Sequence, residues 1–144
     1  MGDLTLSDIA EKMKDIDFCM LTTVTDGGKL SSRPMSNNKD VEYDGDSWFF
    51  AYDDARFIQD VQADDQVGLT FSGDKSLLGK PGIFIAVEGK ATLTKDRPTL
   101  EKHWVDDLER WFPQGIETPG IVLLKVHASR VHYWNGDEEG EIKV

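Results

Sequence analysis

The chain has 144 residues, which is enough for one domain with a hydrophobic core over residues 1–144, and it carries 27 acidic against 16 basic residues. The net charge of -11 would repel nucleic-acid phosphates, so we expect no nucleic-acid partner. No apolar stretch is long enough to span a membrane and the N-terminus lacks the pattern of a signal peptide, so we expect no membrane partner either.

Cys19 is the single cysteine of the chain, which excludes an intrachain disulfide and suits a reducing compartment. We therefore expect a cytoplasmic protein. A lone cysteine in an apolar stretch is most often a small buried side chain, and we prefer that interpretation to a reactive thiol.

The N-terminal third predicts a helix followed by a β-hairpin. Apolar residues recur at helical spacing from Leu6 to Ile16. Residues 18–25 and 30–36 are strand-like and are joined by a turn at Asp26-Gly27. Pro34 lacks a backbone donor, so the second strand should lie at an edge, carry a bulge or turn toward a ligand. Arg33 beside it offers a planar, cationic donor for a flat, anionic molecule.

The middle of the chain alternates between strands and one helix. A turn at residues 43–46 leads into an aromatic strand at 47–52, and residues 53–65 have a helical period. A strand at 66–72 is followed by a glycine-containing loop at residues 73–82. Alternating apolar residues from 83 to 93 then predict a long strand, in which Gly89 marks a bulge.

The C-terminal third predicts a helix and two further strands. Residues 96–98 favour a helix entry, and apolar residues recur about once per turn from Leu100 to Trp111. Residues 120–126 and 130–135 form the last pair of strands, before a charged tail that is acidic at residues 137–139 and ends at 144. Six or more strands in mostly consecutive antiparallel order predict a mainly-β fold, a small barrel with short helices.

Conventional catalytic and metal-binding motifs are absent. The sequence has no dinucleotide-binding glycine pattern, no phosphate-binding loop and no nucleophile elbow. The run Asp40-x-Glu42-x-Asp44-Gly45 resembles the start of a calcium loop, but its twelfth position is Ala51, so we expect no calcium site. The three histidines and the single cysteine lack zinc spacing, so we expect no metal.

Aromatic side chains could fill the core or line a cleft, and both readings stay open for each of them. Those beside turns or at element ends are the better cleft candidates, namely Trp48, Tyr52, Trp111 and Trp134.

Seven short motifs occur in a characteristic order. They are Leu21-Thr22-Thr23 with Asp26-Gly27, Ser32-Arg33-Pro34-Met35, Trp48-Phe49-Phe50, Val67-Gly68-Leu69-Thr70-Phe71, Val87-Glu88-Gly89-Lys90-Ala91, Trp111-Phe112-Pro113-x-Gly115 and Tyr133-Trp134-Asn135-Gly136. With these motifs the chain resembles the general stress protein 26 group of the pyridoxamine 5′-phosphate oxidase-like, FMN-binding split-barrel superfamily. The resemblance covers about residues 5–136.

The resemblance implies a six-stranded antiparallel split β-barrel that forms a homodimer, with two FMN molecules bound in grooves between the subunits. FAD is the alternative flavin. It implies that Arg33 and the backbone next to it contact the flavin, that the end of the third strand frames the phosphate, and that Trp134 comes from the partner. The cofactor-binding residues expected on this basis are Arg33, Pro34, Met35, Phe50, Ala51, Tyr52, Arg56, Trp111 and Trp134.

The chain departs from the family pattern where the phosphate is held. The family has a threonine at the end of the third strand and Ser-x-Lys at the next helix start, whereas this chain has Ala51 and Ala55-Arg56-Phe57. A charge-assisted phosphate contact contributes about 1.5–3 kcal/mol, so its loss would weaken FMN about tenfold or more unless Arg56 replaces it. Acidic residues at 137–139 also make vitamin B6 oxidation improbable, because they would repel a phosphorylated substrate.

From the sequence we therefore expect a flavin-binding protein of the general stress type, with oxidoreductase activity on an unidentified substrate and no residue identified as catalytic. The alternative is a non-enzymatic protein that binds another flat anionic ligand, or a member that has lost its flavin. Ala51, Ala55 and Phe57 favour this alternative.

Overall fold

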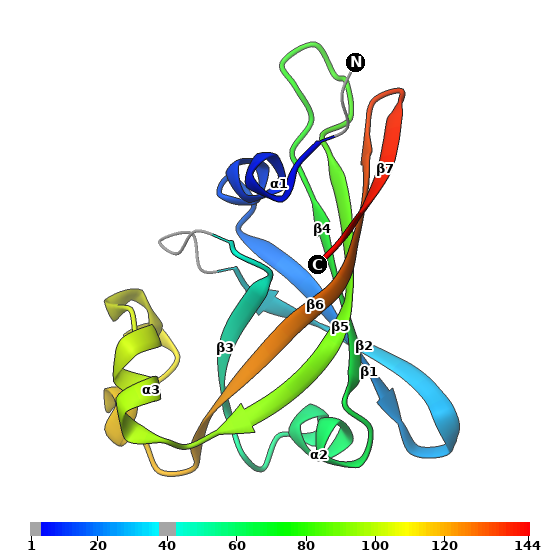
Figure 1. Ribbon diagram of the computed structural model, residues 1–144. Helices are drawn as coiled ribbons and strands as arrows, with labels where there is room; N and C mark the ends of the chain where they lie inside the picture. Colours follow the sequence, from blue (N-terminus) through cyan, green and yellow to red (C-terminus); the bar gives the residue numbers. More distant parts are fainter. Residues whose placement is uncertain (1–3, 38–42) are drawn as a thin grey trace.

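The computed structural model describes residues 4–37 and 43–144 (Figure 1). Asp40 and Glu42 of the calcium-like run, and the first three residues of the chain, lie outside these ranges. The helices are α1 (Leu6–Met13), α2 (Arg56–Ala63) and α3 (Arg97–His103), with short 3-10 turns η1 (Asp26–Gly28), η2 (Asp106–Arg110) and η3 (Gly115–Glu117). The strands are β1 (Phe18–Thr25), β2 (Lys29–Ser36), β3 (Asp46–Tyr52), β4 (Gln66–Ser72), β5 (Phe84–Thr94), β6 (Ile121–Asn135) and β7 (Glu138–Lys143).

The strands form one antiparallel sheet in the order β2-β1-β4-β5-β6-β3, and β7 pairs with the far half of β6. Figure 1 shows this sheet as a strongly curved half-barrel with α1 and α2 at its two ends. The mainly-β, antiparallel split-barrel fold predicted from the sequence is confirmed, and the strands β2 and β3 form the two edges of the main path.

The edge position of β2 explains how the sheet accommodates Pro34. Pairing between β1 and β2 runs from Phe18 opposite Ser36 to Thr25 opposite Lys29 without a shift in register. An edge strand has one side without ladder partners, so a residue without an N–H is tolerated there. Of the three positions expected for this strand, at an edge, with a bulge or turned toward a ligand, the structure shows the edge. The proline produces no bulge.

Two apolar clusters lie on opposite sides of β3 and the adjoining half of β6. The main cluster fills the inner side of the curved sheet and includes Leu21, Leu69, Val87 and Val131. The second cluster lies beneath α3 and the 3-10 turns and is built around Leu100, Phe112, Ile121 and Leu123. Since strand side chains alternate between faces, β3 contributes Phe49 and Ala51 to the main cluster, and Trp48 and Phe50 to the second.

The predicted helix from residue 96 to 111 is wrong in its length. α3 ends at His103, because the backbone of Trp104 is extended, with φ -70° and ψ 136°. The Trp104 ring packs edge-on against Phe50, with 5.2 Å between ring centroids. The apolar residues at helical spacing thus come from two separate segments that contact the same cluster.

The C-terminal expectations need two corrections. Residues 121–135 form the single strand β6 instead of two strands, since Ala128 is fully buried and pairs with β5 and no turn interrupts the chain. Residues 138–143 of the predicted acidic tail form the strand β7. Gly140 of β7 lies against the ring of Tyr133, so close that an added Cβ would be 2.4 Å from the phenol oxygen.

Within the described residues, no helix is long and apolar enough to cross a membrane.

Candidate functional site

Arg33 projects from β2 to the inner side of the sheet and is held there by its own hairpin. Its Nη1 donates hydrogen bonds to the Leu21 carbonyl (3.1 Å) and to Oγ1 of Thr23 (2.9 Å), and its Nη2 donates to Oγ of Ser31 (3.1 Å). The guanidinium carbon also lies 5.2 Å from the centroid of the Phe57 ring. The orientation of this arginine is therefore fixed by β1, β2 and α2 together.

A buried carboxylate connects this arginine to a second one. Asp60 of α2 is 8% exposed and accepts hydrogen bonds from the hydroxyls of Thr23 (3.3 Å) and Thr25 (3.1 Å). Thr25 in turn accepts a hydrogen bond from Nη2 of Arg56 (3.2 Å). Burial lowers the pKa of the Arg33 guanidinium, while the charge of Asp60 opposes this effect and Arg56 adds to it. The network joins α2 to β1 and places two cations near one carboxylate.

Arg33 and Arg56 were predicted from the sequence as site residues, whereas Thr23, Thr25 and Asp60 were not. One signal was available, because Asp60 follows Phe57 and precedes Val61 on the apolar stripe of α2, where a carboxylate would have to be buried. The two threonines gave no comparable signal in a strand rich in β-branched residues.

The three residues that replace the expected phosphate donors offer no polar side chain. Ala51 is 6% exposed and faces the main cluster, Ala55 stands directly before α2, and Phe57 packs beside Arg33. Ala55 is the N-cap residue of α2 and makes no side-chain hydrogen bond that would cap the helix. Arg56, which is exposed, is the cation in the first turn of α2.

Phe50, Tyr52 and Trp111 gather on the other side of β3. Phe50 packs edge-on against Phe112, with 6.4 Å between centroids, and the hydroxyl of Tyr52 donates to the Trp111 carbonyl at 3.0 Å. The Trp111 ring is 53% exposed and has the Arg110 guanidinium 5.7 Å from its centroid. These aromatic residues thus hold the second cluster and its edge.

Trp134 and Pro34 lie on the outer side of the sheet, away from the main cluster. Trp134 is 38% exposed and is stacked on His132, with 4.1 Å between centroids. His132 lies 2.8 Å from a carboxylate oxygen of Glu139 on β7. Pro34 is exposed opposite Met20, whereas Met35 packs against the main cluster. Within one chain the predicted residues therefore form three groups instead of one site.

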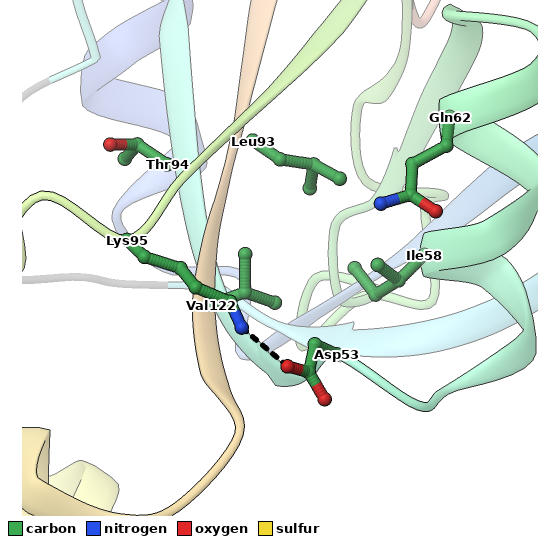
Figure 2. A pocket seen from close by; sticks show the side chains of 7 residues that line it. All are labelled: Asp53, Ile58, Gln62, Leu93, Thr94, Lys95 and Val122. Atoms are coloured by element: carbon green, nitrogen blue, oxygen red, sulfur yellow. Dashed lines mark hydrogen bonds and ion pairs between the residues drawn. The ribbon is translucent and has the colours of Figure 1, made fainter.

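A separate pocket of about 280 Å³ lies between α2, the end of β5 and the start of β6. Figure 2 shows the Gln62 amide directed toward the apolar side chains of Leu93 and Ile58, and the ammonium of Lys95 paired with Asp53. Ligand pockets for drug-sized molecules usually measure about 300–1,000 Å³, so this one is small for a flavin. The pocket is lined by Asp53, Ile58, Gln62, Leu93, Thr94, Lys95 and Val122. None of these is a predicted cofactor-binding residue. The described residues contain no cluster of three or more metal-ligating side chains.

Solved structures with the same fold cover nearly the whole chain. A protein from Clostridium acetobutylicum related to general stress protein 26 has a TM-score of 0.80 and 20% identity, covering 96% of this chain and 94% of its own. The general stress FMN/FAD binding protein of Xanthomonas citri has a TM-score of 0.74 and 21% identity, covering 96% and 95% respectively. At these identities the likeness shows the fold.

Sequence comparisons identify the family. Protein bli-3 of Neurospora crassa is 25% identical over 140 residues, which span 91% of this chain but only 65% of bli-3. The chain thus spans slightly less than two thirds of the length of this relative. The model of the family described as pyridoxamine 5′-phosphate oxidase like matches residues 5–144. Matched over this span, the chain belongs to the pyridoxamine 5′-phosphate oxidase-like family.

Proposed function

We propose that this chain is a cytoplasmic flavin-binding protein of the general stress type, which forms a homodimer and holds FMN in grooves between the two copies. FAD is the alternative flavin, because the Xanthomonas citri neighbour is described as binding either. The same groove would serve an oxidoreductase with an unidentified substrate. Family membership supports the class of protein, and the surroundings of Arg33 support the ligand.

The observation that carries the proposal is the unused donor capacity of Arg33. A guanidinium has five N–H groups, and three hydrogen bonds hold that of Arg33 to Leu21, Thr23 and Ser31. Nε–H and one Nη2–H have no acceptor among the described residues. A planar cation that is fixed by the protein and keeps free donors suits a flat ligand with carbonyl or phosphate oxygens, because little rotamer entropy is lost on binding.

The residues present fit the flavin ring better than its phosphate. Arg33 would donate to the ligand, and Thr23 and Asp60 would hold its guanidinium in place. Arg56, at the first turn of α2, is the cation for the phosphate, since Ala51 and Ala55 offer no donor. A bound flavin would supply electron transfer, while the chain would bind and orient it and exclude water.

The positions of Arg33 and Trp134 on the two faces of the sheet support the proposed homodimer. Arg33 points to the inner side with Thr23, whereas Trp134 lies on the outer side, so one chain does not bring both to one flat ring. A second copy can supply the missing face. The outer side also exposes a stripe of large apolar side chains, which is typical of an interface: Phe18, Met20, Phe84 and Trp134.

A second candidate function rests on Phe57. Its ring covers one face of the Arg33 guanidinium at the position where the family has a lysine. This contact favours a groove that binds a flat anionic ligand without a phosphate, or one that has lost its flavin, in a protein that is not an enzyme.

Flavin titration of the purified protein tests both candidates. We expect Arg33→Ala to weaken FMN binding, measured by fluorescence quenching, by about tenfold or more, which corresponds to about 1.4 kcal/mol. Arg97→Ala is the matched control, because Arg97 is an exposed arginine of α3 that pairs with Glu101 and Glu117. Circular dichroism melting checks that both variants fold.

Riboflavin and reduced nicotinamides complete the test. If FMN and riboflavin bind equally well, the phosphate is not recognised and the second candidate is favoured. A colourless protein that binds no added flavin would contradict the proposal. Bleaching of the bound flavin by NADH or NADPH without oxygen would support oxidoreductase activity.

A further inference from the structure

The loop between β4 and β5 carries the two most exposed large hydrophobic side chains of the described residues. Leu77 and Leu78 have relative exposures of 107% and 87%, so the described residues leave both side chains uncovered. Figure 1 shows this loop extending beyond the end of the sheet, at the same end as the hairpin between β6 and β7. Two neighbouring leucines that contribute nothing to the core indicate a contact with another molecule.

The tip of this loop is a hydrogen-bonded turn. The amide of Ser76 donates to the Lys80 carbonyl (2.9 Å), and the amide of Gly79 donates to the Ser76 carbonyl (2.9 Å). The amide of Lys80 also donates to Oγ of Ser76 (3.1 Å), and Gly79 has a φ of 78°, which favours glycine. At the base, the Gly73 amide donates to the Ile83 carbonyl (2.7 Å). The leucines are therefore presented by an ordered turn, which lowers the entropic cost of binding through them.

The charge beside the leucines is opposite to that of the whole chain. Lys75 and Lys80 flank the tip, although the chain has a net charge of -11. Within the described part of the chain, neither lysine forms an ion pair with a carboxylate. A partner surface that is apolar and acidic would match the loop.

Such a surface lies on this chain, at the hairpin between β6 and β7. Trp134 is 38% exposed on the outer side of the sheet and has Phe84, at 46%, as its cross-strand neighbour on β5. Asp137 and Glu138 follow in the turn and at the start of β7, both exposed. Neither carboxylate has an ion pair among the described residues.

The two surfaces lie at the same end of the molecule, and within the described residues of one chain no hydrogen bond or ion pair joins them. In a two-fold symmetric dimer, a contact between the β4–β5 loop of one copy and the β6–β7 hairpin of the other occurs twice. A two-fold axis near this end of the sheet would bring the loop of each copy to the hairpin of the other.

We propose that the β4–β5 loop is an arm that clasps a second copy of this chain. Leu77 and Leu78 pack on the apolar patch of Phe84 and Trp134 on the other copy, and Lys75 and Lys80 pair with the carboxylates of its β6–β7 hairpin. This inference rests on the proposed homodimer. Because Trp134 is the groove residue expected from the partner, the arm also fixes one wall of the proposed flavin site.

Sedimentation equilibrium of charge and apolar variants tests the arm. We expect Leu77→Ser with Leu78→Ser to raise the dimer dissociation constant about tenfold or more, and Lys75→Glu with Lys80→Glu to do the same at low salt. Adding Asp137→Lys and Glu138→Lys to the lysine variant should restore dimer affinity, since the charges are then exchanged. Leu30→Ser is the matched control, because Leu30 is 74% exposed but lies at the β1–β2 hairpin.

The outcomes separate the arm from the dimer itself. A dimeric wild type with an unchanged dissociation constant in the double serine variant overturns the arm and leaves the proposed function standing. A wild type that stays monomeric at all concentrations overturns both. Binding of the wild type to phosphatidylglycerol vesicles that the serine variant loses, with dimerisation unchanged, would assign the leucines to a membrane surface instead.

Discussion

Cys19 shows at the scale of one residue how burial decides chemistry. Its side chain is 2% exposed in the main cluster, as expected for a small apolar residue of a strand, and burial raises the pKa of the thiol to about 12. The folded state thus keeps the proton over a pH range in which the unfolded chain, with a pKa near 9, has lost it. The thiolate form needed for nucleophilic attack is suppressed in the folded protein.

The shift predicts how stability depends on pH. Between the two pKa values the folded state binds one proton more than the unfolded state, so the free energy of unfolding falls as pH rises, by up to about 1.4 kcal/mol per pH unit. We expect Cys19→Ala to lack this contribution. The measurement is urea denaturation of both proteins at pH 8 and at about pH 10.5. The raised pKa of Tyr43 acts in the same direction in both proteins, so it cancels in the comparison. If the free energy of unfolding changed equally with pH in the wild type and in Cys19→Ala, the pKa of the thiol would not be raised by folding.

At the scale of elements, Gly89 lies at the register shift between β5 and β6. The pairing of β5 with β6 shifts register between Glu88 and Gly89, where the sequence predicted a bulge. A Cβ added to Gly89 would lie 2.4 Å from the carbonyl oxygen of His127, and this backbone atom cannot move without breaking the ladder. Gly68 on β4 is the matched comparison, since its nearest atom, the Val87 carbonyl oxygen, would be 3.5 Å away.

We therefore expect the two strand glycines to respond differently to alanine. Gly89→Ala should lower the free energy of unfolding by about 1–3 kcal/mol or more, because it overpacks backbone against backbone. Gly68→Ala should leave stability unchanged or raise it slightly, because alanine restricts the unfolded chain. Equal losses in chemical denaturation would mean that the bulge tolerates a side chain.

The sequence predicted correctly those elements whose formation depends on residues that are neighbours in the chain. The hairpin at Asp26-Gly27, the strand at residues 66–72 and the bulge at Gly89 all depend on neighbours in sequence. The end of α3 and the strand β7 do not. Trp104 leaves the helix because its ring packs with Phe50, a residue of β3, and the charged tail becomes a strand because β6 offers it a free edge.

The candidate site also has one part that local sequence predicts and another that depends on contacts between distant segments. The sequence indicated Arg33 as a cation beside a proline, and the structure fixes its guanidinium while leaving two of its N–H donors without an acceptor among the described residues. Its supporting carboxylate, Asp60, comes from a helix that is distant in sequence, and only the packing of α2 against β1 brings them together. The separation of Arg33 from Trp134 depends on how β2 and β6 are placed in the sheet, which sets the face that each side chain takes, and no local pattern contains that placement.

At the scale of the whole molecule, the separation of Arg33 from Trp134 means that the proposed flavin site depends on dimer formation. If the flavin lies between copies, dilution below the dimer dissociation constant removes half of each groove, and apparent FMN affinity should fall with it. A site complete within one chain would show no such dependence. We expect the affinity measured by fluorescence quenching to weaken in step with the monomer fraction measured by sedimentation on the same samples.

Met20→Lys gives this prediction a second readout. Met20 is 40% exposed on the outer side of the sheet, so a lysine there adds charge to the proposed interface without disturbing the core. We expect this variant to lose dimer affinity and FMN affinity together, each by about tenfold or more, because an unpaired charge would have to be desolvated. Thr92→Lys, at an exposed position of β5 away from the apolar stripe, should retain both. A monomeric Met20→Lys protein that still binds FMN as tightly as the wild type would place the flavin within a single chain, and Arg33 would then act without Trp134.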